Sequence, residues 1–253
     1  NTVVPNGAAP HNLHPGADAG QRRTGVGRGV GGEDEETARW RDAAEAMYVP
    51  YDDALEVHPQ SAGFTTHQPW DFAATTPEQY PLLLHFPYFD LYRKQVVKQA
   101  DLVLALHLRG DAFSQEAKAR DFAYYEPLTV RDSSLSACTQ AVIAAEVGQL
   151  ELAYDYFGEA ALIDLDNLEH NTRDGLHIAS LAGVWIVAVA GFGGMRDHNG
   201  APTFAPRLPE RPSRLAFGPC LPGPRPEVEG DPPPAPHPQP ERPHPPRPPP
   251  RQT

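Results

Sequence analysis

Apolar residues recur at helical spacing through the middle of the chain. Three or four apolar side chains in every two turns give a helix one buried face. On this basis the sequence predicts helices over 33–47, 92–108, 114–125, 135–147 and 150–163. The first of these opens with acidic residues, which suit the positive end of the helix dipole. The pattern therefore favours a mainly α-helical fold.

The most apolar stretch covers 176–191 and has His177 near its start and glycines at its end. A membrane-spanning helix needs about 20 consecutive apolar residues, and this stretch is shorter. We therefore expect a helix buried on all sides within a helical domain, and no membrane partner. Two short strand candidates follow at 203–205 and 214–217, which places the beginning of a β region over 197–217.

The two ends of the chain lack this periodicity. Residues 1–32 are mostly Gly, Ala, Asn, Pro and Arg, a composition from which we expect no stable structure. Residues 218–253 contain more than half of the 30 prolines. Because proline lacks an amide donor, we expect an extended, disordered tail there. Such a tail leaves open a second class of function, a proline-rich ligand for a binding partner.

Net charge and cysteine content limit the classes of function that fit this sequence. The formal net charge of −12 argues against a nucleic-acid partner. The two cysteines, Cys138 and Cys220, have neither a disulfide pattern nor the spacing of metal ligands. We therefore expect a reduced, cytoplasmic protein without a metal.

A polar and aromatic stretch over 121–136 draws attention to the start of the fourth predicted helix. Asp132 or Ser133 would serve as its N-cap. The hydroxyls of Ser133 and Ser134, together with free amides and the helix dipole, suit an anion such as phosphate. A capped helix with additional serines explains the same residues without any ligand.

Several longer motifs resemble one family. They are Leu-Tyr-Arg-Lys-Gln-Val-Val-Lys-Gln-Ala-Asp at 91–101, Tyr-Tyr-Glu-Pro-Leu-Thr at 124–129, Asp-Ser-Ser-Leu-Ser at 132–136 and Gly-Leu-His-Ile-Ala-Ser at 175–180. In this order they resemble the glycoside hydrolase family 65 disaccharide phosphorylases, which include maltose, trehalose and kojibiose phosphorylase. The resemblance covers about residues 33–217 and leaves 1–32 outside it.

The resemblance implies the second half of an (α/α)6 catalytic barrel over 33–196, followed by the start of a C-terminal β-sandwich. It also implies a reaction, the inverting phosphorolysis of an α-linked glucose disaccharide to β-D-glucose 1-phosphate and a free sugar. Inorganic phosphate is the co-substrate and no cofactor is implied. The intact enzyme would be a homo-oligomer.

Residue roles also follow from the resemblance. Lys98 and Gln99 would hold hydroxyls of the transferred glucosyl unit, and Ser133, Ser134 and His177 would hold phosphate. Hydroxyls and imidazole donate hydrogen bonds to an anion without the repulsion of a carboxylate. Each residue also has a structural alternative. Lys98 would be a solvated position on an amphipathic helix, and His177 a core histidine.

One part of the family pattern is missing from this sequence. The general acid of the family is a glutamate in a Gly-Pro-Asp-Glu-Tyr type of motif, and this motif does not occur here. We therefore expect no catalytic residue in this chain, which reads as an inactive C-terminal fragment with aberrant ends. A hydrolase of the same fold and a non-catalytic sugar-binding protein stay open as alternatives.

Overall fold

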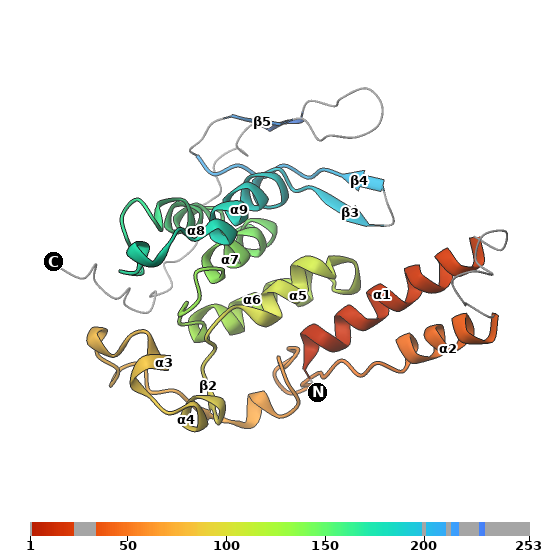
Figure 1. Ribbon diagram of the computed structural model, residues 1–253, viewed down its shortest axis with the longest axis horizontal. Coiled ribbons are helices and arrows are strands. Elements are labelled where there is room, and N and C mark those ends of the chain that lie inside the picture. The colour runs from red at the N-terminus through yellow and green to blue at the C-terminus, as the bar shows by residue number, and fades with distance from the viewer. Residues whose placement is uncertain (1, 23–33, 199–200, 211–213, 218–227, 231–253) are drawn as a thin grey trace.

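The computed structural model describes residues 2–22, 34–198, 201–210, 214–217 and 228–230 (Figure 1). Helices make up most of this part of the chain, and short strands follow them. Four helices form the centre: α5 (Asp101–Leu108), α6 (Gln115–Tyr125), α7 (Ser136–Glu146) and α8 (Leu150–Leu162). In the described residues, no helix has both the length and the hydropathy of a membrane span.

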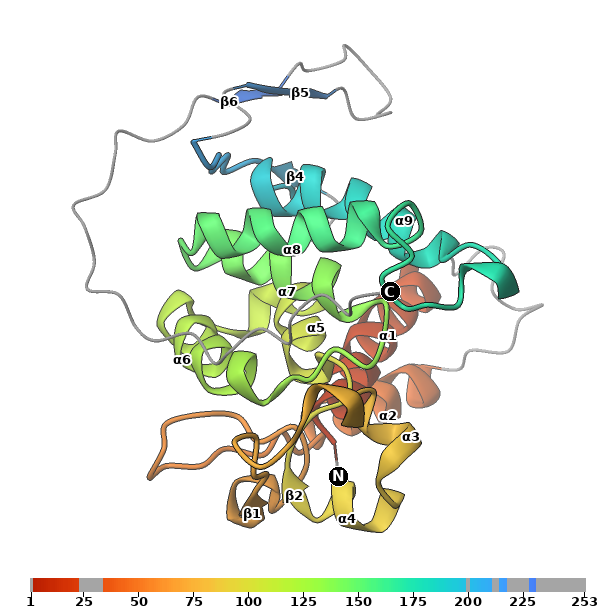
Figure 2. The same cartoon turned by 90° about the vertical axis from the view of Figure 1, so that its left-hand side faces the viewer.

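Helix α7 lies at the middle of the core, between α8 on one side and α5 on the other (Figure 2). Nine of its eleven residues are buried, including the polar Ser136 and Gln140. A helix that is apolar nearly all round is stable only when neighbours cover it on several sides. Elements placed at the ends of α7 are therefore held by the best-packed part of the molecule.

The helices predicted over 114–125, 135–147 and 150–163 are confirmed to within a residue or two by α6, α7 and α8. Each has a repeating apolar face and a recognisable boundary. Ser114, for example, accepts a hydrogen bond from the amide of Ala117 and caps α6.

The prediction of one helix over 92–108 is wrong in its first half. The chain instead forms α4 (Tyr88–Tyr92) and the strand β2 (Lys94–Gln95) before α5 begins. The Val97 amide donates to the Leu128 carbonyl, and the Val97 carbonyl accepts from the Val130 amide. The apolar residues here are spaced like a helix but are buried by extended pairing with another segment.

Short elements connect and surround this segment. Strand β2 pairs in parallel with β1 (Gln68–Pro69), and α3 (Leu82–His85) lies beside α4. The remaining connections contain short 3-10 turns at Phe64–Thr66, Pro77–Gln79, Gly110–Ala112, Glu126–Leu128 and Thr172–Asp174.

The apolar stretch at 176–191 forms α9 (Ile178–Ile186) and a π-helical segment, η7 (Val187–Phe192). The expectation of burial on all sides is wrong for α9. Side chains of η7 pack into the core, whereas Ile178 is 65% and Trp185 62% exposed. The first half of the stretch therefore presents an apolar face that no described residue covers.

Helix α7 and the α9–η7 segment run in the same direction. Cys138, near the start of α7, lies against Gly183 in α9, and Val142, further along α7, lies against Gly191 in η7. Glu146, the last residue of α7, pairs through its carboxylate with Arg196, four residues after η7 ends, at 2.5 Å. The two N-terminal ends therefore lie at the same end of the helical layer, and α8 returns between them along the chain.

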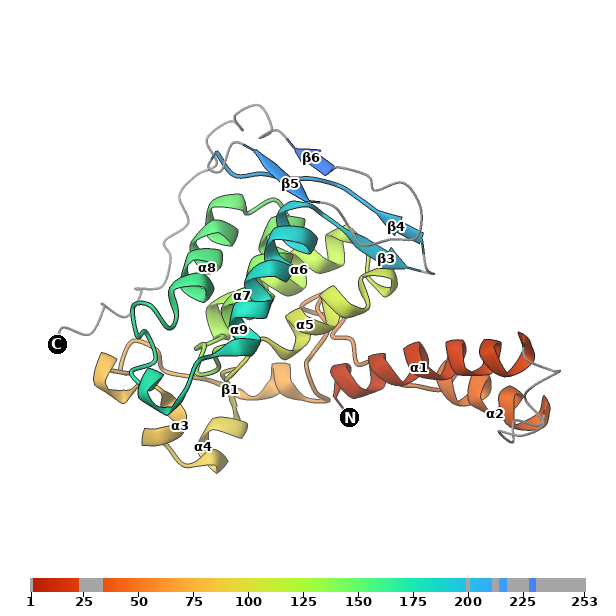
Figure 3. The ribbon, with the colours of Figure 1, turned by 45° about the horizontal axis from the view of Figure 1, so that its top comes forward.

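The expectation of no stable structure over 1–32 is wrong for the described part of that range. Helix α1 (Val3–Arg22) lies beside α2 (Asp34–Glu45), and the two extend away from the core together (Figure 3). Residues 23–32 lie outside the described residues.

Contacts along α1 explain why it forms despite two internal prolines. Val3 and Ala17 are fully buried, and Val3 belongs to the main core cluster. Arg41 of α2 pairs with Asp18 of α1 at 2.8 Å. Two buried residues that lie this far apart do not form a helical pattern, so the sequence alone did not predict α1.

Two antiparallel strand pairs follow the helices. Strand β3 (Arg196–His198) pairs with β4 (Ala201–Thr203), and β5 (Leu215–Phe217) pairs with β6 (Val228–Gly230). Strand β5 agrees with the candidate at 214–217, whereas β4 ends where the other candidate begins. The tail was expected to have no structure, and the three residues of β6 correct this expectation. The other residues of 218–253 lie outside the described residues.

Candidate functional site

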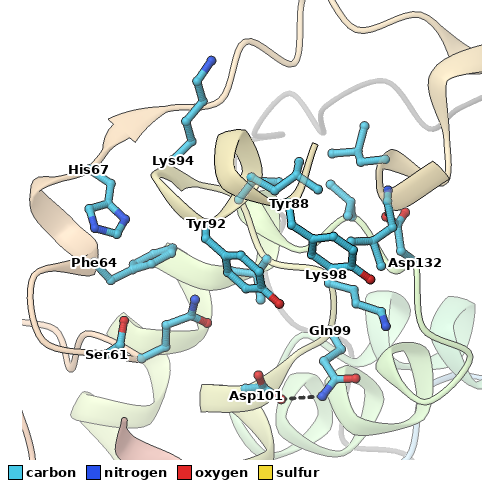
Figure 4. Close-up of a pocket in the computed structure, with 17 residues that line it drawn as sticks. Ser61, Phe64, His67, Tyr88, Tyr92, Lys94, Lys98, Gln99, Asp101 and Asp132 are labelled. Carbon is cyan, nitrogen blue, oxygen red and sulfur yellow. Dashed lines mark hydrogen bonds between the residues drawn. The ribbon is translucent and has the colours of Figure 1, made fainter. Parts of the chain in front are cut away.

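A cavity of about 310 Å³ opens between α3, α4 and the segment that precedes α5 (Figure 4). Its volume is at the lower end of the roughly 300–1,000 Å³ range of small-molecule sites. The polar residues that line it are Gln60, Ser61, His67, Lys94, Lys98, Gln99, Asp101 and Asp132. The two residues predicted to bind the glucosyl unit, Lys98 and Gln99, therefore both line this cavity.

Lys98 and Gln99 lie on a short turn between an extended segment and a helix. The extended side is fixed by the β1–β2 pair and by the pairing of Val97. On the other side, the Gln99 Nε2 donates to the Asp101 Oδ1 at 2.8 Å, one residue after the N-cap of α5. Both side chains are exposed. Lys98 is therefore not on an amphipathic helix, and its ammonium group can reach a ligand in the cavity.

Asp132 is a cavity residue that the sequence suggested only as a cap. Burial raises its pKa to about 6, although amide hydrogen bonds from Leu83 and Leu82 and the charge of Lys98 act in the opposite direction. Its Oδ2 accepts from the Leu83 amide at 3.2 Å. A carboxyl group with a raised pKa therefore lies in the same cavity as the predicted sugar-binding residues.

The predicted N-cap is wrong in detail. Helix α7 begins at Ser136, and Leu135 occupies the cap position without a side-chain hydrogen bond. Asp132 is tied to Leu83 instead, and the Ser133 Oγ accepts from the Leu135 amide at 3.5 Å. The side chain of Ser134 thus stays available for another role.

Ser133 and Ser134 are half-buried in the turn between Asp132 and α7. Neither lines the cavity, but Ser133 directly follows Asp132, which does. The turn that carries the two hydroxyls therefore follows directly in sequence on a residue of the cavity wall.

His177 occupies the N-cap position of α9. Its Nδ1 lies 2.7 Å from the Asp164 Oδ1, and its amide donates to the Asp164 Oδ2 at 2.9 Å. The side-chain hydrogen bond from His177 is the main reason that the pKa of Asp164 is below its ordinary value. These two bonds fix the ring and leave Nε2 as the nitrogen that can meet a ligand.

His177 does not line the cavity, so the structure does not bring all five predicted residues to one surface. It does place His177 and the pair Ser133–Ser134 at corresponding positions, each just before one of two helices that run in the same direction. The roles of Lys98, Gln99, Ser133, Ser134 and His177 in binding stay predictions.

Glu126, in the tyrosine-rich motif, has a structural partner. The Tyr156 hydroxyl donates to its Oε1 at 2.6 Å, whereas Arg131 pairs with Glu159 at 3.2 Å. Glu126 and Arg131 are therefore linked through the Tyr156 hydroxyl, to which the Arg131 Nη1 donates at 3.4 Å. Among the described residues, no group of three or more His, Cys, Asp or Glu side chains could hold a metal ion.

A helical core with its site at the helix starts is the arrangement of an α/α-barrel carbohydrate enzyme. The model of the glycosyl hydrolase family 65 central catalytic domain matches residues 1–186, and the chain belongs to this family. Its helices are part of the (α/α)6 barrel of that domain. The match includes residues 1–32, which corrects the expectation of a non-family segment there.

Similar curated proteins support the assignment to this family. The chain is 58% identical over 215 residues to an uncharacterised glycosyl hydrolase of Mycobacterium tuberculosis, covering 85% of this chain and 27% of that protein. It is 48% identical over 178 residues to the α,α-trehalose phosphorylase of Geobacillus stearothermophilus, covering 70% of this chain and 23% of that protein. The chain thus spans about a quarter of the length of the curated relatives it matches.

A solved structure shows the same fold. A protein from the human microbiome, described as a candidate kojibiose phosphorylase, superposes with a TM-score of 0.81 at 27% identity. The superposition covers 91% of this chain and 32% of the other.

Proposed function

We propose that this protein acts in carbohydrate metabolism as part of a disaccharide phosphorylase. The reaction is the inverting phosphorolysis of maltose, trehalose or kojibiose to β-D-glucose 1-phosphate and a free sugar. One observation carries the proposal: α7 and α9 run in the same direction, so the serine turn and His177 are at the same end of the helical layer.

Phosphate suits this end of the layer for physical reasons. The unpaired amides and the dipoles of two helix starts favour an anion, and phosphate is a common ligand there. The hydroxyls of Ser133 and Ser134 add donors, and Asp164 fixes the ring of His177. Because the Nδ1–H group of His177 donates its hydrogen bond to Asp164, Nε2 is the ring nitrogen that meets phosphate.

The glucosyl side of the proposal rests on the cavity. Lys98 and Gln99 line it with Asp101 and Asp132, so donors and acceptors for sugar hydroxyls are grouped together. Asp132 is followed at once by Ser133, which joins the sugar-binding cavity to the proposed phosphate site.

The proposal assigns binding to this chain and not turnover. Phosphate is its own nucleophile in the reaction, so no carboxylate base is needed to activate water. The leaving oxygen still needs a proton, and the family motif that carries the general acid does not occur in this sequence. We therefore assign no catalytic residue here.

One observation favours a second candidate, a hydrolase of the same fold. Asp132 lines the cavity and its pKa is about 6, as a general base for water would require near neutral pH. Relatives named as glycosyl hydrolases agree with this possibility. A hydrolase has no need of phosphate, so phosphate binding separates the two candidates.

Calorimetric titration of the chain with inorganic phosphate tests the proposal. We expect saturable binding that weakens roughly ten- to a hundred-fold in Ser134→Ala, since one hydrogen bond to a charged group contributes about 1.5–3 kcal/mol. His177→Glu is expected to abolish it, because a carboxylate repels phosphate.

His170→Ala is the matched control, because His170 is an exposed histidine seven residues before His177. It should bind phosphate as the wild type does. Equal phosphate affinity in the wild type, Ser134→Ala and His177→Glu would remove the proposed phosphate site and favour the hydrolase.

A further inference from the structure

Two tyrosines that line the cavity have no part in the function described so far. Tyr88 and Tyr92 lie one helical turn apart on α4, so both side chains point from the same face. Their rings are stacked with centroids 5.8 Å apart and planes 18° apart. Because the rings are stacked, their inner faces lie against each other, and the aromatic surface that they present consists of the outer faces of the stack.

This surface is exposed and also belongs to the cavity. Tyr88 is 56% and Tyr92 73% exposed, which is high for large aromatic side chains. Both rings line the same cavity as Lys98 and Gln99, and Figure 4 shows all four side chains directed into it. Their exposed faces are therefore available to whatever the cavity binds.

Phe89 shows that exposure on α4 is not enough to place a ring at the site. It is 70% exposed, but the guanidinium of Arg93 lies 4.8 Å from its ring centroid, and it does not line the cavity. The two tyrosines thus differ from their neighbour by facing the polar residues of the cavity.

The chemistry of the surface suits a sugar ring. A pyranose presents C–H groups on its faces and hydroxyls around its rim. An aromatic face packs against the C–H groups, while surrounding polar side chains bind the hydroxyls. The cavity supplies polar groups in Lys98, Gln99 and Asp101, and the tyrosines supply the apolar face.

We propose that the stacked pair of Tyr88 and Tyr92 binds the second sugar of the disaccharide, the unit released as free sugar, on an outer face of the stack. This inference rests on the proposed function, in which Lys98 and Gln99 hold the glucosyl unit. Since Lys98 and Gln99 are assigned to that unit, the aromatic surface in the same cavity is left for the sugar joined to it. The tyrosines then contribute to selection of a disaccharide over glucose.

Calorimetric titrations of the chain with maltose, trehalose, kojibiose and glucose test this. In Tyr88→Ala and Tyr92→Ala we expect affinity for the disaccharide that the wild type binds best to fall roughly tenfold, as loss of about 1.4 kcal/mol implies. Affinity for glucose should stay within about twofold. Tyr92→Phe should bind as the wild type does, because it keeps the aromatic face.

Phe89→Ala is the matched control from the same helix and should leave every affinity unchanged. Circular dichroism of each variant establishes that it is folded. If the wild type binds neither glucose nor any disaccharide, the proposed function fails. If it binds a disaccharide and both alanine variants bind it equally well, the tyrosine surface is not a sugar site and the inference is overturned.

Discussion

At the scale of single residues, the protonation of Asp132 in the cavity affects the stability of the fold. Its pKa of about 6 exceeds the ordinary value of 3.8 because burial disfavours the carboxylate. Between these two values the folded protein holds a proton that the unfolded chain has released. Stability therefore falls as the pH rises from about 4 to about 6, and the loss is complete above that window.

Asp132→Asn removes this titration and keeps an acceptor for the Leu83 amide. Its melting temperature should therefore rise relative to the wild type as the pH increases from 4 to 7, with most of the change below about pH 6. Thermal unfolding followed by circular dichroism at several pH values measures the difference.

Asp164→Asn provides a control of opposite sign. The hydrogen bond from His177 lowers the pKa of Asp164, so its contribution is present above the ordinary value of 3.8 and is lost as the pH falls below it. This variant should be less stable than the wild type at pH 7 and approach it in acid. A constant difference between Asp132→Asn and wild type from pH 4 to 7 would contradict the raised pKa.

The sequence identified Lys98 and Gln99 as site residues through a family motif, although their predicted local structure was wrong. Asp132, Tyr88 and Tyr92 were missed as site residues. The motif at 91–101 includes Tyr92, but sequence alone does not distinguish an exposed stacked ring from a buried one. That distinction depends on where α4 sits relative to the cavity, which is set by distant packing.

At the scale of elements, the close contact of α9 with α7 keeps the two helix starts at one end. Gly183 makes the contact possible, because a Cβ there would lie 2.8 Å from the Cys138 Cβ and would also overlap its sulfur. A glycine inside a helix otherwise weakens it. Close packing between the helices thus explains why glycine occupies this position.

Gly183→Ala should destabilise the protein by about 1–3 kcal/mol, the usual range for overpacking a core. Urea denaturation measures the change in the free energy of unfolding. Gly158→Ala on α8 is the control, because nothing lies within 4 Å of its added Cβ. It should instead stabilise by about 0.5–1 kcal/mol. Equal effects of the two substitutions would show that α9 does not pack on α7 in this way.

Helices α6, α7 and α8 were predictable because their apolar residues recur at helical spacing, although the cap expected for α7 was wrong. The segment at 96–97 was not, since two buried valines fit either a helix or an extended chain. Its pairing with Leu128 and Val130, some thirty residues away, decided the outcome. Local pattern carries no information about such a partner.

At the scale of the whole molecule, the sequence predicts the fold class. It does not predict which apolar helix faces are buried. The apolar run at 176–191 predicted burial, yet α9 leaves Ile178 and Trp185 exposed. The chain also spans only about a quarter of the length of its curated relatives. Helix α1 shows the opposite error, since a stretch without apolar periodicity is held by the buried Val3 and Ala17 and by the Arg41–Asp18 ion pair.

The central claim is that one end of this helical layer binds both a glucosyl unit and phosphate. β-D-Glucose 1-phosphate carries both groups, so its binding to the chain, measured by calorimetry, is the most direct test. We expect saturable binding that weakens roughly ten- to a hundred-fold in Lys98→Met and again in Ser134→Ala, since each substitution removes a donor. Absence of binding, or equal affinity in the wild type and both variants, would contradict the account.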